Sequence, residues 1–95
     1  MILHPELSRY LVAYLHPDWD AEFSTVDAAF DAFLDDIGPE ERAAVAGSLD
    51  DAVAAGDEAI AEEVRDLGCG WWPGDDAGAH VRWFVRMRDA ARARS

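Results

Sequence analysis

The feature that most constrains this chain is an apolar stripe of helical period between residues 25 and 37. Apolar side chains recur there every three or four positions, at Val26, Ala29, Phe30, Phe33, Leu34 and Ile37. This spacing places them on one face of an α-helix. No segment shows the alternating β-branched pattern that a strand needs. The sequence therefore predicts an all-α fold.

Prolines and glycines divide the chain into five helical segments. The first is expected at about 5–16 and ends at His16-Pro17, because a residue before proline is pushed out of the α region. The second is expected at about 25–36, with Ser24 or Thr25 as its cap and Gly38 closing it. The third begins at Pro39 and runs to about Ala55, the fourth lies between Gly56 and Gly68, and His80, Trp83, Phe84, Met87 and Ala91 define the fifth.

The length and charge of the chain narrow its class. Its 95 residues fit one compact domain, residues 1–95, with one core of about five short helices. There are 20 acidic and 8 basic residues, which give a formal charge of −12. Through Asp66 the chain has 17 acids and 3 bases, and the remainder has 3 acids and 5 bases. The acidity is therefore expected on the first four helices.

This acidity bears on the partner. Phosphate binding requires Lys and Arg, so nucleic acid and anionic membranes are disfavoured and a basic protein partner is favoured. A composition that reflects only genome bias and solubility is the equally weighted alternative. Cys69 is the single cysteine, and no signal peptide or membrane-spanning stretch is evident, so a cytoplasmic location is expected.

The segment from His16 to Glu22 places three carboxylates, Asp18, Asp20 and Glu22, in a loop between helices. A calcium loop that starts at Asp18 would need glycine and glutamate where Phe23 and Ala29 stand, so calcium is disfavoured. We expect Trp19 to fill the gap between the first two helices while Asp18 or Asp20 caps backbone N–H groups. A partner-contact role for the three acids is the alternative.

Cys69 and His80 could form a nucleophile and base, but no third, orienting group follows a recognisable pattern. We therefore expect no enzyme activity, no cofactor and no metal. Trp71 and Trp72 are consecutive in a turn-rich loop, so either one stays exposed as a binding anchor or both cover the helix ends. The five arginines of the last helix are expected to pair with the chain's own acids: Arg82, Arg86, Arg88, Arg92 and Arg94.

Two motifs carry a family resemblance. A tyrosine-rich first helix runs into a His-x-Asp-Trp segment, His16, Asp18 and Trp19, and a Leu-Gly-aromatic-Pro segment follows much later, with Leu67, Gly68, Trp72 and Pro73. The chain resembles the immunity proteins of contact-dependent growth inhibition systems over most of its length. Pro17 and the Cys69-Gly70 pair depart from the pattern of that family.

The resemblance implies a small helical cytoplasmic protein that binds and blocks a cognate toxin domain, often a nuclease. The contacts would come from carboxylates of the second to fourth helices and from an exposed aromatic residue. The partner-binding candidates are Asp18, Asp20, Glu22, Asp31, Asp35, Asp36, Trp71 and Trp72, while His16, Asp18 and Trp19 are expected to be structural. A small acidic adaptor with a non-toxin partner is the second hypothesis, and an enzyme that depends on Cys69 or a metal is the third.

Overall fold

The computed structural model of the chain describes residues 2–94. The helical elements are α1 (Pro5–Arg9) with the π-helical η1 (Tyr10–Tyr14), the short 3₁₀ helix η2 (Trp19–Ala21), α2 (Val26–Asp36), α3 (Pro39–Ala55), α4 (Asp57–Leu67) and α5 (Ala79–Ala93). No strand occurs between residues 2 and 94. The predicted all-α class and the five helical segments are confirmed for this part of the chain.

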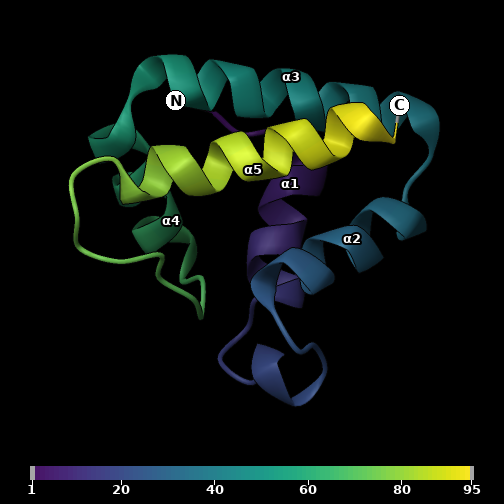
Figure 1. Cartoon of the computed structure of the whole chain (residues 1–95), viewed down its shortest axis with the longest axis horizontal. Coiled ribbons are helices and arrows are strands. Elements are labelled where there is room, and N and C mark those ends of the chain that lie inside the picture. Colours follow the sequence, from purple (N-terminus) through teal and green to yellow (C-terminus); the bar gives the residue numbers. More distant parts are fainter. Residues whose placement is uncertain (1, 95) are drawn as a thin grey trace.

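The two longest helices, α3 and α5, lie side by side and form one layer of the molecule (Figure 1). The α1–η1 segment passes beneath them, α2 lies on one side of it, and α4 lies on the other (Figure 1). The principal extents are 31 × 31 × 19 Å, so the molecule is a flattened globule. The loop between α4 and α5 is consequently on the opposite side from α2.

The core takes one apolar face from each helix. Its largest fully buried side chains include Trp83 and Phe84 of α5, Phe33 of α2, Leu49 of α3 and Tyr10 of η1. The Tyr10 hydroxyl donates to the carbonyl oxygen of Val26 over 3.3 Å, and burial raises the pKa of Tyr10 above its usual range. The helical periods read from the sequence therefore identify the buried faces.

The first helix differs from its expected range of 5–16. The α-helical turn gives way to a π turn, in which the N–H of Leu15 donates to the carbonyl of Tyr10 over 3.2 Å, and the helix ends at Tyr14. The wider turn keeps Tyr10, Leu11 and Leu15 all fully buried. A pattern with a period of 3.6 residues does not foresee such a turn.

The C-terminal end of α2 is held by a side chain of the neighbouring helix α3. Arg42 of α3 donates through Nη1 to the carbonyls of Leu34 and Ile37, at 3.0 and 2.8 Å, so α2 does not rely on Gly38 to end it. Gly38 has an ordinary φ of −80° and starts α3. The expected caps hold elsewhere, because Thr25 Oγ1 accepts the N–H of Ala28 and Gly68 ends α4 with a φ of 75°.

Candidate functional site

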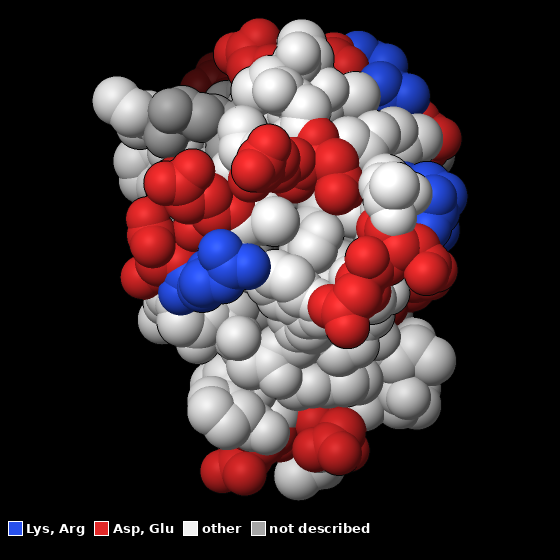
Figure 2. All heavy atoms as spheres, turned by 90° about the vertical axis from the view of Figure 1, so that its left-hand side faces the viewer, with Lys and Arg blue, Asp and Glu red and all other residues white. Residues whose placement is uncertain are grey.

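The acidic residues of α4 form a row on its exposed face. Ile60 and Val64 turn inward, while Glu58, Glu62 and Asp66, four residues apart, are exposed on the other side. Among residues 2–94, none of these three carboxylates has an ion-pair or hydrogen-bond partner. Figure 2 shows carboxylate groups gathered over the upper part of the face that α4 and the following loop share, with few basic atoms between them.

Trp72 lies beside this row in the loop after α4, and 39% of its surface is exposed. Its indole Nε1 donates to Asp75 Oδ1 over 3.0 Å, and its ring meets the His80 ring edge-on with centroids 4.3 Å apart. The Arg65 guanidinium of α4 lies 5.4 Å from the centroid of the same ring. Three neighbours therefore hold one exposed tryptophan in a defined orientation.

The neighbouring Trp71 has a different environment. It is half-buried against the core and meets Trp83 edge-on at a centroid distance of 4.8 Å. Of the two arrangements that the sequence left open, the structure adopts the first, with one tryptophan inward and one exposed.

Asp57, at the start of α4, joins this side of the molecule to α5. Its Oδ1 accepts the N–H of Val81 in the first turn of α5 over 3.0 Å, in place of a cap from Gly78. Hydrogen bonds from the backbone of Val81, together with those of His80 and Gly78, lower the pKa of Asp57. This carboxylate fixes α4 against α5 and is structural.

The loop from His16 to Glu22 is organised by its histidine. The N–H of Asp18 donates to His16 Nδ1 over 3.1 Å, and His16 Nε2 lies 3.5 Å from Glu22 Oε1. Trp19 is partly buried and packs against the core. The cap predicted from Asp18 or Asp20 is wrong, because no side-chain hydrogen bond caps η2 and His16 supplies the acceptor instead. Both acids are exposed.

The same arrangement occurs at the start of α1, where the N–H of Glu6 donates to His4 Nδ1 over 3.1 Å. His4-Pro5-Glu6 and His16-Pro17-Asp18 are thus two copies of one His-Pro-acid turn, one at each end of the first helix. The sequence contains this repeat, but it was not among the motifs from which the site was predicted.

The two motif segments meet at Gly70. Its N–H donates to the carbonyl of Leu15 over 2.6 Å, and a Cβ at this position would lie 2.6 Å from the carbonyl carbon of His16 and from the nitrogen of Pro17. Only glycine permits this close approach of two backbones. The two departures from the family pattern, Pro17 and Cys69-Gly70, therefore contact each other, which sequence spacing could not indicate.

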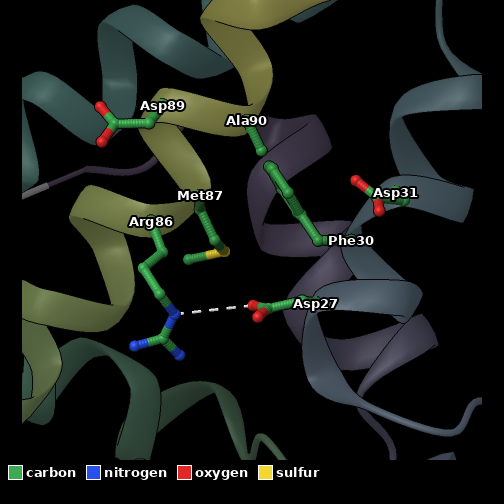
Figure 3. A pocket seen from close by; sticks show the side chains of 7 residues that line it. All are labelled: Asp27, Phe30, Asp31, Arg86, Met87, Asp89 and Ala90. Atoms are coloured by element: carbon green, nitrogen blue, oxygen red, sulfur yellow. Dashed lines mark ion pairs between the residues drawn. The ribbon is translucent and has the colours of Figure 1, made fainter.

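The predicted contact residues of α2 are largely occupied. Asp36 accepts a hydrogen bond from the Tyr14 hydroxyl, and Asp35 pairs with Arg94. Asp31 lies on the rim of a shallow groove of about 370 Å³ between α2 and α5, whose floor includes Phe30 and Met87. Figure 3 shows the residues around this groove and the ion pair that crosses it, between Asp27 and Arg86 at 3.6 Å.

Most arginines of α5 pair as predicted. Arg88 lies 3.3 Å from Asp50, Arg92 pairs with the same carboxylate, and Arg86 and Arg94 pair with α2. Arg82 is the exception, because it donates to the carbonyl of Ala77 over 3.2 Å. The basic C-terminal helix therefore offsets acids of α2 and α3.

Cys69 and His80 show no arrangement for catalysis. Burial raises the pKa of the Cys69 thiol and lowers the pKa of His80, and no hydrogen bond joins the two within the described residues. Within residues 2–94, no cluster of three or more His, Cys, Asp or Glu side chains could hold a metal ion. None of the helices described is long and apolar enough to cross a membrane.

Residues 2–94 form a small all-α protein that exposes carboxylates and one tryptophan on the side of α4. The family model for the CdiI immunity protein matches residues 4–91. The chain belongs to this family, whose members are immunity proteins against toxins of contact-dependent growth inhibition, and its partner is accordingly a cognate toxin protein. No curated protein and no solved structure gives a significant match.

Proposed function

We propose that this immunity protein neutralises a nuclease toxin by covering the toxin's positively charged active site with its acidic surface. A nuclease must hold phosphates, so its active site carries Lys and Arg. A surface of the opposite sign speeds the encounter with such a site and blocks substrate entry once bound. Inhibition of this kind is stoichiometric and requires no catalysis by the immunity protein.

The observation that carries the proposal is the row of unpartnered carboxylates on α4. Glu58, Glu62 and Asp66 are exposed, and no arginine of the described chain lies within ion-pair distance of them. Their negative potential is therefore directed to solvent and available to a basic partner. The same potential repels nucleic acid and anionic lipids.

The proposed place of action is the cytoplasm, because a nuclease toxin attacks nucleic acid there. Cys69 supports this location, since it is a free thiol and the chain has no second cysteine for an internal disulfide.

Co-expression tests the function directly. The cognate toxin domain is expressed alone and together with the immunity protein, and growth, co-purification and nuclease activity are measured. Restored growth, a stable complex and loss of nuclease activity at equimolar ratio are expected. Failure to rescue growth together with failure to co-purify would contradict the function, and a rescued toxin without nuclease activity would contradict the toxin class.

A further inference from the structure

Trp72 and the exposed row of α4 form a continuous surface. We define the α4–Trp72 surface as Glu58, Glu62 and Asp66 together with Trp72, which the guanidinium of Arg65 joins to α4 at 5.4 Å from the ring centroid. Figure 2 faces this side of the molecule and shows carboxylates, with a basic side chain among them, around atoms of uncharged residues. An apolar area with a charged rim is the usual plan of a protein-binding site, and the exposed indole of Trp72 supplies apolar area here.

The orientation of Trp72 is set before any partner arrives. Asp75 fixes the indole N–H at 3.0 Å, and the His80 ring on which the indole rests is itself 97% buried, since only 3% of its surface is exposed. Binding through a side chain that is already immobilised avoids most of the rotamer entropy that ordering an exposed residue requires. Tryptophan in such a setting is the residue type most enriched among interface anchors.

The chemistry of the surface selects its partner. A row of three unpartnered carboxylates on the helix that contacts an exposed indole matches a protein surface on which Lys or Arg side chains border an apolar recess. The guanidinium of Arg65 already contacts the Trp72 ring, which shows that the ring accepts a cation within stacking distance. A basic protein surface is thus the occupant that both the charge and the aromatic residue favour.

The groove between α2 and α5 is a weaker site for the same partner. Two of its three rim carboxylates are committed, because Asp27 pairs with Arg86 at 3.6 Å and Asp89 pairs with Arg88 at 3.3 Å. A basic partner would have to compete with these arginines. On the α4–Trp72 surface, Glu58, Glu62 and Asp66 have no ion-pair partner within residues 2–94, and the cation of the chain that lies there, Arg65, contacts the Trp72 ring and not these carboxylates.

We infer that the toxin docks on the α4–Trp72 surface, with Trp72 as the apolar anchor and Glu58, Glu62 and Asp66 as the contacts for its basic residues. This inference rests on the proposed function, because it assigns that function to one face of the molecule. It keeps Trp72 from the candidates that the sequence named, and it places the charged contacts on α4 and not on the six candidate acids of the His16–Glu22 loop and α2.

The test compares matched variants of the full chain for binding to the cognate toxin domain. The α4 triple variant carries Glu58→Gln, Glu62→Gln and Asp66→Asn. The control triple carries Asp20→Asn, Glu40→Gln and Glu41→Gln. It changes the net charge by the same amount as the α4 triple variant, but at η2 and at the end of α3 that is far from α4. Trp72→Ala is paired with Val12→Ala, whose side chain is also exposed, at 46%, and lies on η1.

Surface plasmon resonance at low salt is expected to show about a 30-fold or greater loss of affinity for Trp72→Ala and about a tenfold slower association for the α4 triple variant. Both controls are expected within about twofold of wild type. Thermal unfolding of each variant verifies the fold, and the α4 triple variant, which alters only exposed side chains, keeps the test valid if Trp72→Ala is destabilised.

Wild-type affinity and association for the α4 triple variant, or for a folded Trp72→Ala, would overturn the inference while leaving the proposed function intact. An equal loss in the control triple would overturn it as well, because binding would then depend on net charge and not on this face. If wild-type protein itself fails to bind the toxin domain, the proposed function fails and the assignment of the surface fails with it.

Discussion

Helices α2 and α4 have the same length and the same formal charge, yet they present that charge differently. Each has 11 residues, and each carries −4, from four acids and no base in α2 and from five acids and one base in α4. In α2, three of the four carboxylates have a partner. Asp27 pairs with Arg86, Asp35 pairs with Arg94, and Asp36 accepts a hydrogen bond from the Tyr14 hydroxyl. In α4, Asp57 alone among the carboxylates has a hydrogen-bond partner within residues 2–94, the backbone N–H of Val81 in α5.

The difference shows that the acidity of a helix and its availability to a partner are separate properties. Helix α5 passes close to α2 and contributes the arginines that offset it, whereas α4 meets the first turns of α5, where Arg82 bonds to a loop carbonyl. The two acidic helices lie on opposite sides of the molecule (Figure 1). Arginines therefore offset part of the charge of α2, whereas no ion pair within residues 2–94 offsets Glu58, Glu62 or Asp66 of α4.

The largest expected effect concerns the loop that places Trp72 next to α4. Gly70→Ala introduces a Cβ 2.6 Å from the backbone of His16 and Pro17, and neither backbone can move as a flexible side chain would. We expect a loss of about 1–3 kcal/mol in the free energy of unfolding, measured by urea denaturation. The midpoint temperature of thermal unfolding would fall by about 4–8 °C for each kcal/mol lost.

Gly47→Ala is the matched control, because nothing lies within 4 Å of the added Cβ in the interior of α3. Alanine is the better helix former there, so this variant is expected to gain about 0.5–1 kcal/mol. Wild-type stability in Gly70→Ala would show that the backbone contact does not fix the loop.

The next effect concerns Asp57, the one engaged carboxylate of α4. Asp57→Ala removes the acceptor at the first turn of α5 and is expected to lower the free energy of unfolding by about 1 kcal/mol. Asp57→Asn retains an acceptor and is expected to lose less. Urea denaturation of both variants at neutral pH measures the difference, and equal losses would mean that the charge, not the hydrogen bond, holds α5.

The lowered pKa of Asp57 also makes stability depend on pH. A carboxyl whose pKa is lower in the folded state contributes stability above its unfolded pKa, and that contribution is lost as the pH falls through the folded pKa. Wild type should therefore lose stability in acid more steeply than Asp57→Asn, as followed by circular dichroism across the acidic range. Parallel acid profiles would show that Asp57 is not the group responsible.

The smallest expected effect is on stability. Neutralising the carboxylates of α2 and those of α4 is expected to change the free energy of unfolding in opposite directions. Neutralising Asp27, Asp35 and Asp36 of α2 as asparagines removes two ion pairs and takes the charge from the acceptor of the Tyr14 hydroxyl, so a loss of up to about 1 kcal/mol in total is expected at low salt. Neutralising Glu58, Glu62 and Asp66 of α4 removes repulsion between like charges four residues apart and is expected to gain a few tenths of a kcal/mol. Urea denaturation at low and high salt measures both, and changes of the same sign would erase the distinction.

The sequence predicted the helices well because each has its own apolar period and its own proline or glycine boundary. The stripe from Val26 to Ile37 and the left-handed Gly68 are examples, since both depend on local rules. The π turn at Tyr10–Tyr14 was missed because it depends on which residues the rest of the core buries. The caps from Arg42 and Asp57 were missed for a related reason, as each comes from another helix.

The binding surface was only partly predictable. The sequence indicated an acidic protein with a possible exposed tryptophan, and it named Trp72 among the candidates. It could not separate α2 from α4, because counting charges does not reveal that Arg86 and Arg94 pack against α2. Nor could it show that Gly70 contacts His16 and Pro17, 53 or more positions away in the chain.

The most direct test of this account is the ionic-strength dependence of toxin association for wild type and for the two charge-matched triple variants of α4 and α2. The Debye length is about 8–10 Å near physiological ionic strength, so only charges close to the interface influence the rate there. Stopped-flow association between low and physiological salt is expected to give a steep decrease for wild type and the α2 variant and a clearly shallower one for the α4 variant. Equal slopes for the two variants would contradict the claim that the carboxylates of α4, and not those of α2, attract the toxin.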